Sequence, residues 1–166
     1  SSTPGDDATG VLADTNIILV FDKAVYTTAG DITIHRALTG ATIETISVTS
    51  WRVTGSGTNT ITVNPAGTLD SQTGYYIKVT PGAFQDDANN PYAGITNINT
   101  LNFTTSDTDA PTLFSSTPVD DATEVGTDTD LTLVFDETVY TTTGDITIVI
   151  AWNGVTVETI SVTSWR

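Results

Sequence analysis

The sequence has 166 residues, of which 20 are acidic and 5 basic, so its formal net charge is −15. A surface this acidic repels nucleic acid and anionic lipid, and we expect neither as a partner. Cysteine is absent, which excludes disulfides and thiolate metal sites. No apolar run approaches the roughly 18 residues of a membrane helix, so no membrane insertion is expected in this segment.

Short runs of alternating apolar and polar residues follow one another along the chain, separated by Gly, Asn, Asp and Pro. Alternation with a period of two is typical of half-buried strands. It predicts about seven strands, at 1–4, 17–21, 32–34, 46–51, 60–63, 75–79 and 101–103. Helical periodicity is hard to find, and the pattern therefore predicts an all-β fold of the immunoglobulin-like or fibronectin-III-like sandwich type.

The chain also repeats itself. Residues 1–52 align without a gap on 115–166, and 36 of these 52 pairs are identical. The offset of 114 residues is the size of a domain and far exceeds a solenoid repeat of roughly 20–50 residues. We predict a complete module at 1–106, a polar linker at 107–113 and the first half of a second module at 114–166. The chain is expected to be a piece of a longer protein.

Two features carry a family resemblance. Leu69 stands six residues before Tyr75, which resembles the tyrosine corner of immunoglobulin-like sandwiches, where the hydroxyl bonds nearby backbone. The order of further landmarks resembles the bacterial Ig-like domain of S-layer and adhesin-type proteins: STPxDDAT at the start, then 19–22, 74–79, 86–94 and 102–105. The resemblance implies an extracellular, cell-surface, non-catalytic building block that acts as a spacer in a stalk, fibre, adhesin or S-layer.

The repeat is an internal test for catalysis, because a residue essential to every module should recur. His35, the only histidine, becomes Val149, Lys23 becomes Glu137, and no cysteine nucleophile exists. Adjacent Asp6 and Asp7 do not supply the two facing carboxylates of a glycosidase. We therefore expect no enzyme. The alternatives are a carbohydrate- or ligand-binding adhesion module and an accessory domain of a secreted hydrolase.

The Asp-rich loops predict calcium as a candidate cofactor, since calcium takes six to eight oxygen ligands. The linker pair Asp107 and Asp109 is similar to the Asp-rich linkers of calcium-rigidified adhesins. A junction site would comprise Asp107, Asp109, Asp6, Asp7, Asp70 and Asp136. A second site, in the penultimate loop, would comprise Asp86, Asp87, Asn89, Asn90 and Asp22. The alternative is that Asp and Asn serve the turns, where their side chains bond their own backbone.

The aromatic residues and the half module give the remaining expectations. Trp51 and its equivalent Trp165 are predicted in a strand, as core or sheet-surface residues, Trp152 at an exposed turn, and His35 facing solvent. The half module is expected to expose a hydrophobic face. Its partners would be neighbouring Ig-like modules of the same or adjacent chains, by strand complementation or fibre packing, unless the boundary merely falls inside a longer fibre.

Overall fold

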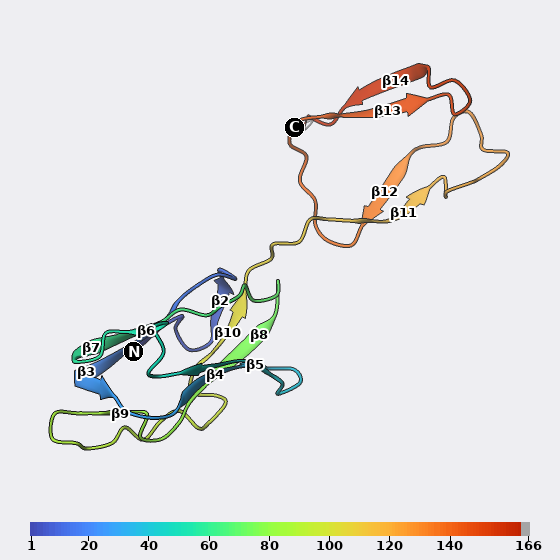
Figure 1. Cartoon of the computed structure of the whole chain (residues 1–166). Coiled ribbons are helices and arrows are strands. Elements are labelled where there is room, and N and C mark those ends of the chain that lie inside the picture. Colours follow the sequence, from blue (N-terminus) through green and yellow to red (C-terminus); the bar gives the residue numbers. More distant parts are fainter. Residues whose placement is uncertain (164–166) are drawn as a thin grey trace. The chain divides into compact units, whose positions relative to one another are not determined.

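The computed structural model describes residues 1–163 and is all β, with fourteen strands in that range (Figure 1). The chain divides into two compact units, unit 1 at Ser1–Asp109 and unit 2 from Ala110 onward. Among the described residues there is no helix long and apolar enough to span a membrane.

Unit 1 is a sandwich of two sheets. The first sheet has the order β1-β3-β7-β6, with β9 paired to the end of β3. The second sheet has the order β2-β10-β8-β4-β5. The strand bounds are β1 Ser2–Thr3, β2 Ala8–Val11, β3 Ile17–Thr27, β4 Asp31–Arg36, β5 Thr42–Ser47, β6 Val53–Thr54, β7 Thr58–Val63, β8 Gly74–Val79, β9 Phe84–Gln85 and β10 Asn102–Thr105.

The core of unit 1 lies between these sheets because alternate residues of each long strand point inward. Ile32 and Ile34 of β4 are fully buried, and they lie opposite Val79 and Ile77 of β8. Each aliphatic side chain removed from water in this way contributes roughly 1.5–3 kcal/mol. The rest of the buried cluster comprises Ile17, Leu19, Val25, Ile46, Val48, Ile61, Val63, Tyr75, Ala83, Phe84, Ile95, Leu101 and Phe103.

The predicted all-β sandwich is confirmed, and each of the seven predicted strands overlaps a strand of the structure. The structure adds β2, β6 and β9. The two-residue strands β6 and β9 are too short to show a periodicity, and β2 is a four-residue strand that pairs parallel with β10, far away in sequence. One predicted strand ends early: β5 stops at Ser47, and Trp51 lies in the following turn.

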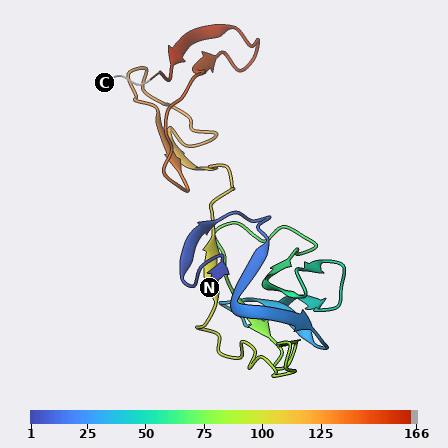
Figure 2. The same cartoon turned by 90° about the vertical axis from the view of Figure 1, so that its left-hand side faces the viewer.

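Unit 2 consists of two hairpins, drawn in orange and red in Figure 2. β11 (Leu113–Thr117) pairs with β12 (Thr132–Phe135), and β13 (Asp145–Val149) pairs with β14 (Thr156–Ser161). The register of β13 with β14 is that of β4 with β5 shifted by 114 residues, down to the irregularity before the last pair. The repeated sequence therefore reproduces the local pairing of unit 1.

Burial separates the two units. None of the described residues from 110 to 163 is buried. Leu131 is 45% exposed, whereas its equivalent Ile17 is 1% exposed; Ile148 is 40% exposed, whereas Ile34 is fully buried. In unit 1 these positions are covered by β7 and β8, which come later in the chain than the repeated segment.

Candidate functional site at the module exit

The loop that leads into β8 is fixed by a tyrosine corner. The hydroxyl of Tyr75 accepts a hydrogen bond from the Asp70 backbone N–H at 2.9 Å, and the Tyr75 ring is 1% exposed. Leu69 packs against the core from the same loop. Burial raises the pKa of Tyr75 above its ordinary value, so the hydroxyl stays protonated. The bond expected from the spacing of Leu69 and Tyr75 is thus present.

This loop also holds the end of β10 and the first residues that follow it. The buried Thr105 hydroxyl donates to the Asp70 carbonyl at 2.6 Å and accepts from the Thr73 N–H at 2.9 Å. Gln72 N–H donates to the Ser106 carbonyl at 3.1 Å. Thr108 N–H donates to Ser71 Oγ at 2.9 Å. We call these two segments, 70–73 and 105–108, the exit contact.

The exit contact includes two of the carboxylates predicted to form a junction calcium site. Asp107 Oδ1 accepts from Ser71 Oγ at 3.4 Å and from the Asp109 N–H at 3.1 Å. Asp70, in the facing segment, pairs with the guanidinium of Arg36. Sequence reasoning therefore placed Asp70 and the linker correctly beside each other, although both carboxylates already have partners.

Asp6 and Asp7 are not beside the linker, and that part of the predicted arrangement is wrong. Asp6 Oδ1 accepts from both the backbone N–H and the side-chain amide of Asn102, each at 3.0 Å. Asn102 begins β10, whereas the linker follows its end, about 10 Å away at 3.3 Å per residue. The cause is the parallel pairing of β2 with β10, which brings the start of both strands together.

Asp136 belongs to unit 2 and has its own partner there. Its carboxylate accepts from the Thr112 N–H at 2.8 Å and from the Thr112 hydroxyl at 2.5 Å. These hydrogen bonds lower the pKa of Asp136. They close the first hairpin of unit 2 where β12 ends.

The second predicted cluster does come together, since Asp22, Asp86 and Asn90 line one open pocket of about 250 Å³. Asp86 Oδ1 accepts from the Ala88 N–H at 3.0 Å and from the Asn90 N–H at 2.9 Å. Its Oδ2 pairs with Lys23 Nζ at 3.3 Å. Hydrogen bonds from Asn90, first through its side chain and then its backbone, lower the pKa of Asp86 to about 2.

The neighbouring residues of this loop are engaged in the same way. Asn89 has a left-handed backbone, with φ of 63°, and its Oδ1 accepts from Gln85 Nε2 at 3.0 Å. A hydrogen bond with Asp87 raises the pKa of Tyr26. Within residues 1–163, no three Asp, Glu or His side chains gather closely enough to hold a metal ion. The geometry favours the turn interpretation, and calcium stays a prediction.

The aromatic residues differ from expectation in one case. Trp51 is 82% exposed in a turn rather than packed in a strand, because β5 ends before it. Trp152 is 84% exposed, as expected, and Trp165 lies outside the described residues. The exposed ring of Trp51 had no sequence signal, because a strand continued from 46–48 would have carried it onto the sheet.

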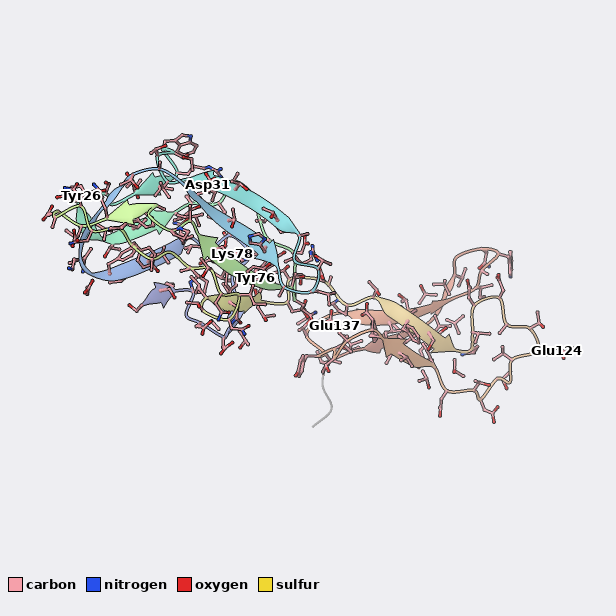
Figure 3. The ribbon with its side chains drawn as sticks, turned by 90° about the horizontal axis from the view of Figure 1, so that it is seen from below. Tyr26, Asp31, Tyr76, Lys78, Glu124 and Glu137 are labelled. Carbon is pink, nitrogen blue, oxygen red and sulfur yellow. The ribbon has the colours of Figure 1, made fainter. Side chains whose placement is uncertain are left out.

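A stacked pair on the outer face of the second sheet was missed. His35 stacks on Tyr76 with 4.8 Å between ring centroids, and Lys78 Nζ lies 5.7 Å from the Tyr76 centroid. Tyr76 and Lys78 are labelled in Figure 3. His35 Nε2 is 2.8 Å from Thr33 Oγ1. Only the register of β4 with β8, which places His35 opposite Tyr76, could have revealed this pair.

Comparison with known proteins agrees with this architecture. A search of curated proteins finds no match. Among solved structures, the crystal structure of CopC from Methylosinus trichosporium OB3b is similar at 13% identity and a TM-score of 0.46, covering 66% of this chain and 93% of that one. The family model described as "Bacterial Ig-like domain" matches residues 1–105 and again 107–165. The chain therefore belongs to the bacterial Ig-like domain family, with one match on each side of the exit contact.

Proposed function

We propose that this chain is a non-catalytic structural repeat of a bacterial surface stalk, fibre, adhesin or S-layer protein, and that it acts as a spacer. Family membership supports the broad class, because bacterial Ig-like domains typically occur in surface or extracellular proteins. The finer role as a spacer is our proposal. It rests on how unit 1 holds the segment that leaves it.

The observation that carries the proposal is the exit contact. A spacer must transmit tension and direction from one module to the next, so its last strand should be tied to the module body. Here the buried Thr105 hydroxyl and the backbone groups of Ser106 and Thr108 bind the corner loop that Tyr75 anchors to the core. The direction of the chain as it leaves unit 1 is thereby fixed by hydrogen bonds that need no metal.

Single-molecule pulling tests the spacer role directly. With the chain held at its two ends, a spacer predicts that residues 1–109 resist force and then unfold in one event. Each freed residue adds about 3.5 Å of contour length. The matched comparison is the Ser71→Ala variant, which removes one linker partner and leaves the core intact, against Ser47→Ala on the opposite edge strand. Gradual lengthening of unit 1 without a distinct event would contradict the proposal.

The exposed ring of Trp51 favours a second candidate, a carbohydrate-binding adhesion module, because exposed aromatic rings are platforms for sugar faces. Binding of the chain to a glycan array, lost in a Trp51→Ala variant and kept in Leu38→Ala, would support it. Binding that survives Trp51→Ala would assign the interaction elsewhere.

A further inference from the structure

The open face of unit 2 has the same strand pairing as the covered face of unit 1. β13 and β14 repeat the register of β4 and β5, and Ser116 opposite Leu133 repeats Ser2 opposite Leu19. The unit 1 pairings therefore show what kind of strand such a face accepts.

In unit 1 two later strands cover this face, both antiparallel. β8 pairs with β4 and places Ile77 opposite Ile34. β7 pairs with β3 and places Ile61 opposite Leu19. Three of these four isoleucine and leucine side chains are fully buried, and Leu19 is 5% exposed. The equivalent edges of β13 and β12 have no further strand paired to them among residues 110–163.

Unit 2 also keeps the space that the covering segment needs. At Gly30 an added Cβ would lie 2.9 Å from Thr80 Cβ, because Thr80 follows β8 directly over that glycine. At the equivalent Gly144, the nearest atom to an added Cβ is a Val162 methyl group at 3.9 Å. The site above Gly144 is therefore open, and it has the shape that Thr80 fills in unit 1.

Charge narrows the choice of occupant. Residues 110–163 carry nine acidic side chains and no Lys, Arg or His, so a second copy of unit 2 would meet strong like-charge repulsion. The segment 58–80 carries one acidic and one basic residue, Asp70 and Lys78. In unit 1 Lys78 lies opposite Thr33, one residue-pair from Asp31, and Figure 3 labels both charged residues on this sheet. The equivalents in unit 2 are Thr147 and Asp145.

We propose that unit 2 is a docking surface for a strand-donating segment with the pattern of residues 58–80, supplied by another Ig-like module of this repeat type. The β8-like strand pairs antiparallel with the free edge of β13, with Ile77 opposite Ile148 and Val79 opposite Ile146. The β7-like strand pairs with β12. Val149 and Ile150 replace His35 and Arg36 at this edge, so Tyr76 of the donor packs on apolar side chains instead of stacking on an imidazole.

Amide hydrogen exchange tests this docking on the intact chain. The 166-residue chain is mixed with a synthetic peptide of sequence 58–80, and exchange is followed in β13 and, as an internal control, in β4. We expect exchange in β13 to slow by about tenfold or more while β4 is unchanged, because β4 is already paired. A peptide carrying Ile77→Asp and Val79→Asp should lose the effect, as should a chain carrying the exposed-face substitution Ile148→Asp.

Three results would overturn the proposal. The first is unchanged exchange in β13 at saturating peptide. The second is equal protection by the substituted peptide, which would mean nonspecific adhesion. The third is a chain that is already a dimer with slow exchange in β13, measured by light scattering without peptide, which would assign the surface to a second copy. None of these results depends on whether the chain acts as a spacer.

Discussion

At the residue scale, Asp86 orders its loop by accepting hydrogen bonds from Ala88 and Asn90 and pairing with Lys23. Because its pKa in the folded chain is about 2, below the ordinary 3.8, it adds stability that is complete above pH 3.8. That contribution is lost as the pH falls through about 2.

We expect an Asp86→Asn variant to lose this part of the acid sensitivity, because the neutral amide keeps an acceptor oxygen without titrating. Urea unfolding between pH 7 and pH 2 measures it: the stabilities of the two chains should converge toward pH 2. Asp14→Asn removes the same charge without these hydrogen bonds and serves as the control. Curves for Asp86→Asn and the parent that stay parallel would show that Asp86 does not order the loop through its charge.

Tyr75 gives a second prediction at this scale. Tyr75→Phe removes the acceptor of the part-buried Asp70 N–H and should cost ~1–3 kcal/mol of unfolding free energy. Tyr76→Phe should cost much less, because Tyr76 holds His35 through ring stacking rather than through its hydroxyl. Chemical denaturation of both variants decides this, and equal losses would mean that the corner hydrogen bond contributes nothing specific.

At the element scale, the turn between β6 and β7 depends on a glycine. Gly55 has φ of 97°, and an added Cβ would lie 2.0 Å from the Thr60 carbonyl oxygen. Gly55→Ala should therefore destabilise unit 1 by about 1–3 kcal/mol or more, since both the conformation and the close approach exclude a side chain. Gly67→Ala, where nothing lies within 4 Å, should change stability by less than about 0.5 kcal/mol. Similar midpoints for the two variants in thermal unfolding would contradict this reading.

Strands with a clear alternation, such as β4 and β8, could be predicted from the sequence because each buries one side. Long-range pairing could not. The parallel contact of β2 with β10 has no local signal, and for that reason Asp6 was wrongly placed beside the linker. The exit contact was also invisible, because Ser71 and Thr105 are ordinary strand and turn residues. Only the Leu69–Tyr75 spacing pointed to that corner.

At the scale of the whole molecule, the structure bears on the predicted calcium dependence. Calcium at a hundred times its dissociation constant would add about 2.7 kcal/mol to a module that binds it only when folded. We expect the thermal unfolding of unit 1 to be the same in calcium and in EDTA, because Asp6, Asp70, Asp86 and Asp107 all have hydrogen-bond or ion-pair partners already. A midpoint that rises in calcium would restore the prediction made from the Asp-rich loops.

The central claim is that unit 1 fixes the direction of the chain leaving it, and backbone ¹⁵N relaxation at residues 105–108 tests this most directly. The exit contact predicts order parameters near the ~0.85 of rigid backbone through Thr108, falling in a Ser71→Ala variant but not in Ser47→Ala. Order parameters below about 0.6 from Ser106 onward in the parent chain would contradict the account, because the segment would then be a flexible tether.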